Sequence, residues 1–173
     1  MHRSLLAALL LTLALPLAAA DIRELTWSEM VPADAPPQTT EPAPIHDLSQ
    51  LGNVLSESGP ATAQQSPAAP VVQALDGQRV KLPGYIVPLD VTDEGRVTEF
   101  LLVPYFGACI HVPPPPSNQI VHVTSELGVL MDALYQPFWI EGSLKVEQTS
   151  SELAEAGYQM EAEKIYAYEM PES

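Results

Sequence analysis

Proline constrains this chain more than any other residue type. There are 18 prolines among 173 residues, roughly twice the usual share of about 5%. A proline ring fixes φ and removes the backbone N–H, so proline is excluded from helix interiors and central strands. Eight of the prolines lie between residues 31 and 70, and four are consecutive at 113–116. The sequence therefore predicts a Pro-rich, largely irregular segment at 21–70 and a folded domain at 71–173.

The first 20 residues have the three parts of a secretory signal peptide. Arg3 gives a positive start, residues 4–20 are almost entirely apolar, and small alanines precede Asp21. This combination is typical of a signal peptide that is removed after export. A membrane anchor is the alternative, but the apolar run is short for a span of about 20 residues. We expect cleavage after Ala20 and a mature protein in the periplasm that does not span the membrane.

The charge balance excludes one class of partner. Seven Lys and Arg against 22 Asp and Glu give a formal net charge of −15. Binding of nucleic acid requires a Lys/Arg surface that displaces the counterions of the phosphates, and anionic membranes attract basic segments for the same reason. We therefore expect neither as a partner. Acidic runs such as Glu161/Glu163 are interpreted as solvated surface, with weak attraction of cations as the alternative.

Hydrophobic periodicity after residue 71 predicts a mostly β domain. Five strands are expected, and the strict alternation that starts at Phe138 is the clearest signal; the strands are 77–90, 97–105, 119–124, 138–147 and 158–169. A stripe of Leu127, Leu130, Met131 and Leu134 predicts a short helix after the third strand, and a second short helix is expected at 150–156. This order favours a small five-stranded OB-like barrel, with an open α+β sandwich as the alternative.

Bends in the strands fit a closed barrel. Gly84 and Gly142 would supply kinks, and Pro88 indicates an edge or a break in the first strand. The N-terminal segment starts with a short helix near Trp27, which we expect to dock on the barrel. The rest of 21–70 is interpreted as a Pro/Ala/Ser-rich linker, mobile over 56–70.

One loop carries the residues that could perform chemistry. Cys109 is the only cysteine of the sequence, so no intramolecular disulfide forms, and His111 follows two residues later. In an extended backbone both side chains would face the same way, roughly 6.6 Å apart at Cα. Zinc accepts both thiolate and imidazole ligands. We predict a metal site made of Cys109, His111 and His122, with Asp90, Glu99 and His46 as further candidates.

The alternative for the same loop is purely structural. Cys109 would then be a small buried hydrophobe and His111 a hydrogen-bonded loop residue. A Cys/His enzyme is disfavoured, because the two residues are only two positions apart, which makes a productive contact awkward, and no G-x-S-x-G, C-x-x-C or Gly-rich phosphate loop is present. We expect no catalytic residues.

A scaffold flanks the predicted site. The four prolines, Pro113, Pro114, Pro115 and Pro116, form a stiff rod without N–H donors, and the amides of Asn118 and Gln119 are expected to bind carbonyls that the prolines leave without local partners. Trp139 alternates to the outer face of its strand. It is predicted to cover the N-terminal segment or to mark a partner surface.

At these residues the chain resembles a known family. The stretches "LPGYIVPLD", "LLVPYFGACIHVPPPPSNQIV" and "PFWIEGSLKVE", together with an early "LTWSEMVP", resemble domain of unknown function 3299, a family of exported Gram-negative bacterial proteins. The resemblance spans about residues 78–168. Such proteins are often encoded beside ABC transporter genes of the metal type, so the resemblance implies a periplasmic accessory in metal handling.

Two functions follow as expectations. The first is a periplasmic metal-binding accessory of an ABC transport system, with Zn²⁺ as the favoured metal and Cu⁺ as the alternative. Its partner would be the ABC transporter permease or a periplasmic metal-binding protein, and a homodimer is compatible with the sequence. The second is a metal-free interaction module that docks a transporter component or a partner subunit.

Overall fold

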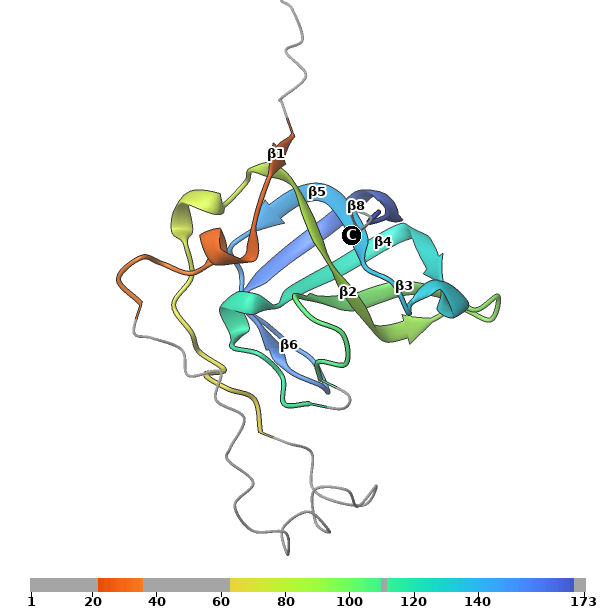
Figure 1. Ribbon diagram of the computed structural model, residues 1–173, viewed down its shortest axis with the longest axis horizontal. Helices are drawn as coiled ribbons and strands as arrows, with labels where there is room; N and C mark the ends of the chain where they lie inside the picture. The colour runs from red at the N-terminus through yellow and green to blue at the C-terminus, as the bar shows by residue number, and fades with distance from the viewer. Residues whose placement is uncertain (1–21, 36–62, 110–111, 170–173) are drawn as a thin grey trace, which may run out of the picture.

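A closed β-barrel is the centre of the fold in the computed structural model, which describes residues 22–35, 63–109 and 112–169 (Figure 1). Its five strands are β2 (Arg79–Val91), β3 (Arg96–Val103), β4 (Val121–Leu130), β5 (Phe138–Lys145) and β8 (Tyr158–Ala167). They pair in the order β2-β3-β4-β8-β5, and β5 pairs back with β2. The β4–β8 pair is parallel and the other four are antiparallel. The predicted OB-like barrel is confirmed.

Alternation along each strand separates an inner from an outer face. Inward residues such as Leu82, Phe100, Val123 and Ile140 are fully buried in one core cluster. Their sequence neighbours point outward, because successive side chains of a strand alternate between the two faces. Burying an aliphatic or aromatic side chain contributes about 1.5–3 kcal/mol, so the barrel interior is the main source of stability.

Two glycines at which the sequence predicted kinks, Gly84 and Gly142, let neighbouring strands approach closely. A Cβ at Gly84 would lie 2.8 Å from the Val103 carbonyl oxygen, and one at Gly142 would overlap the carbonyl oxygen of Glu161. The β5–β8 register shifts between Glu141 and Gly142, and the β2–β3 register shifts after Pro88. These irregularities sharpen the local twist that closes a small barrel.

The helix predicted from the Leu127–Leu134 stripe is wrong. β4 continues through Leu130, because Val129 and Leu130 pair with Val97 and Arg96 of β3. Gly128 has φ +60° within the irregular part of this pairing, a backbone conformation that an α-helix does not contain. Only the 3-10 helix η4 (Met131–Ala133) follows the third barrel strand.

The helix predicted at 150–156 is also wrong. Two short strands, β6 (Thr149–Ser150) and β7 (Glu155–Ala156), pair there instead. The Ser151 hydroxyl donates to the Ala154 carbonyl oxygen at 2.7 Å, and the Ala154 N–H bonds the same hydroxyl at 3.1 Å. Serine side chains that bond nearby backbone favour turns over helix.

The N-terminal segment is part of the barrel's packing. β1 (Arg23–Glu24) pairs in parallel with β2, and the 3-10 helix η1 (Trp27–Met30) follows. Leu25 and Met30 are fully buried in the core, and the Trp27 indole donates to the Pro83 carbonyl oxygen at 2.6 Å. The expectation that Trp27 docks on the barrel is confirmed.

The proline rod is a buried spine rather than an open loop. Pro114, Pro115 and Pro116 are buried. The Gln65 N–H donates to the Pro114 carbonyl at 3.2 Å, and the Gln64 side chain donates to that of Pro115 at 3.0 Å. The interpretation of 56–70 as mobile linker therefore fails for residues 63–70, which supply the donors that the prolines lack.

The two amides after the rod also bind carbonyls, as predicted, but those of distant segments. Asn118 donates to the Pro70 carbonyl oxygen at 2.7 Å, and Gln119 donates to that of Trp27 at 2.8 Å. Both lie in the 3-10 helix η3 (Ser117–Gln119). Within the residues that the structure describes, the 3-10 helix η2 (Gln73–Leu75) completes the set of short helices. None of the helices in the described ranges is long and apolar enough to cross a membrane.

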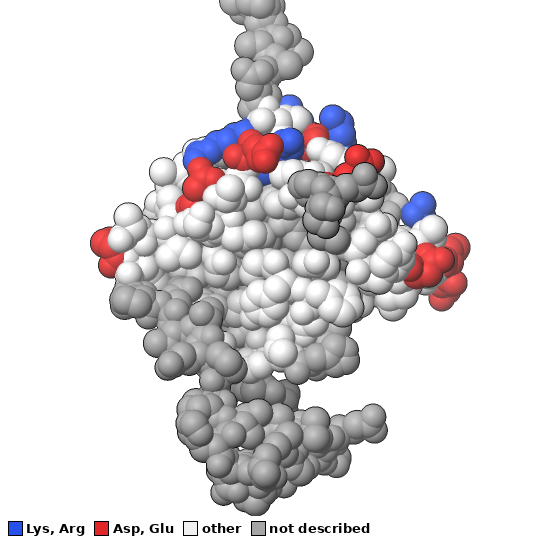
Figure 2. Space-filling view, viewed as in Figure 1, with Lys and Arg blue, Asp and Glu red and all other residues white. Residues whose placement is uncertain are grey.

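Charge is unevenly spread over the surface. In the view of Figure 2, Lys, Arg, Asp and Glu gather along the upper rim and at both side edges, and the centre of the face carries neither sign. The loop that follows β3 lies on this face (Figure 1). The chain is strongly acidic as a whole, so an uncharged face is a departure from its average surface.

Candidate functional site

The outer face of the β3–β4 pair carries the candidate site. Leu101 and His122 are direct cross-strand partners, as are Glu99 and Thr124. Opposite residues of an antiparallel pair share a face, and the alternate residues, such as Phe100 and Val123, point into the core. His122, Glu99 and Leu101 therefore lie together outside the barrel.

A carboxylate holds the imidazole of His122. The His122 Nε2 lies 2.8 Å from Oε1 of Glu99, and the histidine side chain is only 12% exposed. A carboxylate oxygen accepts hydrogen bonds, so Nε2 carries the hydrogen and the neutral ring keeps its lone pair on Nδ1. Metal-binding histidines are commonly oriented by a carboxylate in this way.

Cys109 lies against the apolar part of the same face. It packs on a buried cluster that includes Leu101, Val103, Ala108 and Ile120. Ile120 is two residues from His122, and Leu101 pairs with it. Burial raises the pKa of the Cys109 thiol to about 11, so the apo protein holds a protonated, weakly nucleophilic thiol at neutral pH.

The backbone at Cys109 is not extended. Its φ is +65°, a left-handed conformation that is costly for a residue with a side chain. The Val112 N–H donates to the Gly107 carbonyl at 3.2 Å, and Ala108 and Val112 form a parallel bridge. The argument that an extended Cys-x-His places both side chains on one side does not apply to this loop. His111 and His46 lie outside the described residues.

The remaining described candidate ligands lie next to each other, because Asp90 is the cross-strand partner of Glu99. Glu99 contacts His122, and Asp90 lines a groove nearby. Across the described ranges no three His, Cys, Asp or Glu side chains form a group that could hold a metal ion. The site of Cys109, His111 and His122 therefore stays a prediction, supported by the shared face of its first and third members.

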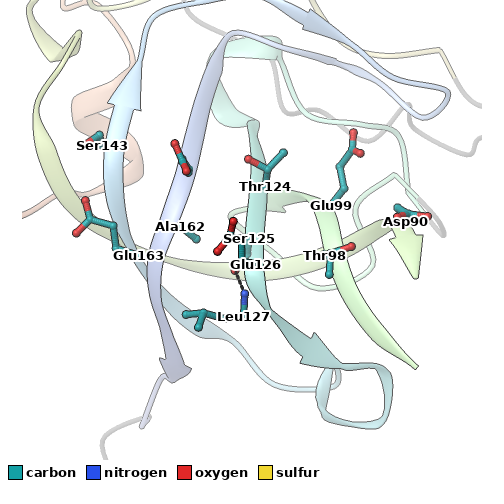
Figure 3. A pocket seen from close by; sticks show the side chains of 11 residues that line it. Asp90, Thr98, Glu99, Thr124, Ser125, Glu126, Leu127, Ser143, Ala162 and Glu163 are labelled. Carbon is teal, nitrogen blue, oxygen red and sulfur yellow. Dashed lines mark hydrogen bonds between the residues drawn. The ribbon is translucent and has the colours of Figure 1, made fainter. Parts of the chain in front are cut away.

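An acidic groove of about 620 Å³ adjoins the His122–Glu99 pair (Figure 3). It lies where β4 and β8 diverge, since their parallel pairing stops at Thr124 and Glu161. Hydroxyl side chains and five carboxylates line it, namely Asp90, Glu99, Glu126, Glu161 and Glu163. Clustered carboxylates in a concave site raise the local concentration of cations.

Sequence reasoning missed this groove. Glu161 and Glu163 alternate with buried residues along β8, so the sequence indicates only that they face outward. Their convergence with Glu126 and Asp90 depends on the pairing register of four strands, which no local pattern reveals.

Trp139, the predicted partner surface, lies in a balanced charged patch. The Lys81 ammonium is 4.5 Å from the centre of its ring, and the Tyr168 ring is at 5.2 Å. Trp139 is half-buried on the outer face of β5. Its role as a partner surface stays a prediction.

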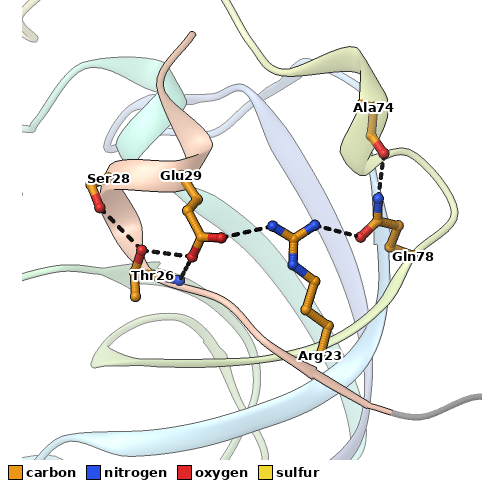
Figure 4. A network of polar contacts seen from close by, with 6 residues as sticks. All are labelled: Arg23, Thr26, Ser28, Glu29, Ala74 and Gln78. Carbon is orange, nitrogen blue, oxygen red and sulfur yellow. Dashed lines mark hydrogen bonds and ion pairs between the residues drawn. The ribbon is translucent and has the colours of Figure 1, made fainter. Parts of the chain in front are cut away.

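Ion pairs neutralise the basic residues around this patch. Arg23, Arg79, Lys81 and Lys164 pair with Glu29, Glu163, Glu24 and Glu141, respectively. Figure 4 shows the Arg23 guanidinium between Glu29 and Gln78. The Thr26 hydroxyl and Arg23 hold the pKa of Glu29 at about 2. The Glu141 carboxylate accepts from the Tyr166 hydroxyl, and burial raises the pKa of Tyr166 to about 12.

Comparison with known proteins supports the resemblance. A family model described as protein of unknown function (DUF3299) matches residues 27–167. The chain is 65% identical to a DUF3299 family protein from Pseudomonas aeruginosa PAO1 with a crystal structure, covering 87% of this chain and 99% of that one with a TM-score of 0.76. No curated protein matches the chain. The chain therefore belongs to the DUF3299 family.

Proposed function

We propose that this protein is a periplasmic metal-binding accessory and that zinc is its metal. The observation that carries the proposal is the His122–Glu99 pair, with 2.8 Å between Nε2 and Oε1, on the face that also holds Cys109. An imidazole oriented by a carboxylate, a nearby thiol and an acidic groove form a suitable entry and binding surface for a divalent cation.

Each group has a distinct part in this proposal. His122 would bind the ion through Nδ1, and Cys109 through its sulfur. Glu99 is a positioning residue, because it fixes the ring and its tautomer. The thiol must lose its proton on binding, so metal uptake releases a proton and strengthens as pH rises. Cu⁺ is the alternative metal, since it also accepts thiolate and imidazole.

The partner follows from the family resemblance. An exported accessory of this kind would deliver its ion to an ABC transporter permease or to a periplasmic metal-binding protein. The half-buried, protonated thiol of Cys109 fits a carrier better than an enzyme, because a nucleophilic cysteine needs a lowered pKa. We propose no catalytic role for it.

The direct test is zinc binding by the reduced, metal-free protein. Titration in competition with a chromogenic chelator should give saturable binding, and both Cys109→Ser and His122→Ala should weaken it at least tenfold. Tyr135→Ala is the control, because Tyr135 is 73% exposed in the loop after η4 and does not line the groove. Equal affinities of wild type and Cys109→Ser would refute the proposal.

A metal-free interaction module is the second candidate function. It is favoured by the uncharged face beside Cys109, where Phe106 is 62% exposed and Val112 43% exposed. Interfaces are enriched in aromatic residues and depleted of charge at their centres. In this case a partner copurified from the periplasm would be lost with Phe106→Ser but retained with Cys109→Ser.

A further inference from the structure

A long part of the folded chain carries no charge. Residues 100–125 contain no Asp, Glu, Lys or Arg, and neither do residues 82–89, in a chain with a formal net charge of −15. The two stretches are neighbours in the barrel, since Tyr85 pairs with Val103 and Val87 with Leu101. They account for an uncharged surface on an otherwise acidic protein.

Aromatic side chains stand out from this surface. The Phe106 ring packs edge-on against Tyr85, with 5.7 Å between ring centres. Tyr105 is also exposed and donates its hydroxyl hydrogen to the Pro113 carbonyl at 3.5 Å. We call Tyr85, Tyr105, Phe106, Cys109 and Val112 the uncharged face.

Charge selects the occupant of the uncharged face. Two copies of so acidic a chain repel each other wherever their carboxylates would come together. At a surface without carboxylates the two copies can associate without this repulsion. A surface lacking both signs is self-complementary in charge, as a two-fold interface must be. An exposed apolar patch is costly unless something covers it.

We propose that the uncharged face joins two copies of this chain and that the zinc site is completed across their interface. This inference rests on the proposed zinc binding. In each copy Cys109 packs on the cluster that contains Leu101, the cross-strand partner of His122, whereas structural zinc takes four ligands. Two copies related by a two-fold axis supply two sulfurs and two imidazoles. The complex holds one ion per two chains.

The test measures mass and zinc content together. Full-length mature protein is studied by size-exclusion chromatography with light scattering, with zinc and with a chelator, and zinc is counted by elemental analysis. We expect a dimer with one zinc per two chains, which added salt strengthens by screening the repulsion. Phe106→Asp should give a monomer with zinc affinity lowered at least tenfold. Tyr135→Asp, 73% exposed in the loop after η4, is the matched control and should remain a dimer.

The possible failures are distinguishable. A wild-type monomer that binds one zinc per chain overturns the interface and leaves the proposed function intact. A dimer that binds no zinc refutes both the proposed function and the zinc site shared between two copies. In that case only the dimer interface remains supported. A Phe106→Asp variant that is folded by circular dichroism yet dimeric places the interface elsewhere and overturns the inference.

Discussion

The hydroxyl of Tyr158 joins two segments that precede the barrel. It donates its hydrogen to the Met30 carbonyl at 2.7 Å and accepts the Val72 N–H at 2.8 Å. Tyr158 is fully buried at the start of β8. One side chain of the last strand therefore binds both the segment before residue 36 and the segment after residue 62. We infer that both segments belong to the same cooperative unit as the barrel.

Removing that hydroxyl should destabilise the whole domain. Tyr158→Phe leaves a buried carbonyl and a buried N–H without their partner, which costs about 1–3 kcal/mol. Urea denaturation followed by tryptophan fluorescence would show a lower midpoint with an unchanged slope. Tyr135→Phe is the control, because an exposed tyrosine should change stability by less than about 0.5 kcal/mol. Equal midpoints of the two variants would contradict the anchoring role.

Closure of the barrel should depend on Gly142. A methyl group there overlaps the Glu161 carbonyl in the β5–β8 pair, so Gly142→Ala should cost about 3 kcal/mol or more. Gly95→Ala separates steric overlap from backbone strain. Gly95 has φ +73° but open space around it, so that variant should cost only about 1–2 kcal/mol. Thermal unfolding measures both, and a smaller loss at Gly142 than at Gly95 would count against the closure argument.

Much of the barrel could be predicted because alternation is local. The pattern from Phe138 onward requires no knowledge of the partner strands, and the five strands lie within a few residues of their predicted places, except that β4 extends beyond 124. The Leu127–Leu134 stripe misled because apolar spacing of three and four also fits the end of a strand with an irregular pairing. Pairing of Val129 with Val97 decides between the two readings, and that contact is distant in sequence.

Only part of the candidate site could be predicted from the sequence. Cys109 and His122 stood out by residue type, but the contact between His122 and Glu99 depends on the β3–β4 register. The left-handed backbone of Cys109 could not be foreseen, since that conformation usually marks glycine. Gln64 and Gln65 lie in what resembles a linker, and only the unmet carbonyls of the proline rod explain their placement.

Reactivity of Cys109 should follow its raised pKa. Burial raises the pKa of the Cys109 thiol from 9.0 to about 11. The rate of alkylation by iodoacetamide should therefore be low at pH 7–9 and should rise towards pH 11. The sign of the effect on stability follows from linkage. The unfolded chain loses the thiol proton at a lower pH than the folded protein. The contribution of Cys109 to stability is therefore constant below about pH 9 and falls between about pH 9 and 11. Cys109→Ser should remove this component of the decline, and an alkylation midpoint near 8.5 would contradict the burial argument.

Positioning of His122 by Glu99 can be separated from the general charge of the groove. Glu99→Ala and Glu126→Ala each remove one lining carboxylate, but only Glu99 contacts the imidazole. Loss of the orienting partner should weaken zinc binding about 10–100-fold, whereas loss of Glu126 should weaken it less than about threefold, because one of five carboxylates contributes only to the diffuse field. Competition titrations at low and high salt provide the measurement. The loss of zinc affinity in Glu126→Ala should disappear when salt screens the charges of the groove, whereas the loss in Glu99→Ala should persist. Equal, salt-sensitive losses would show that Glu99 acts only through its charge.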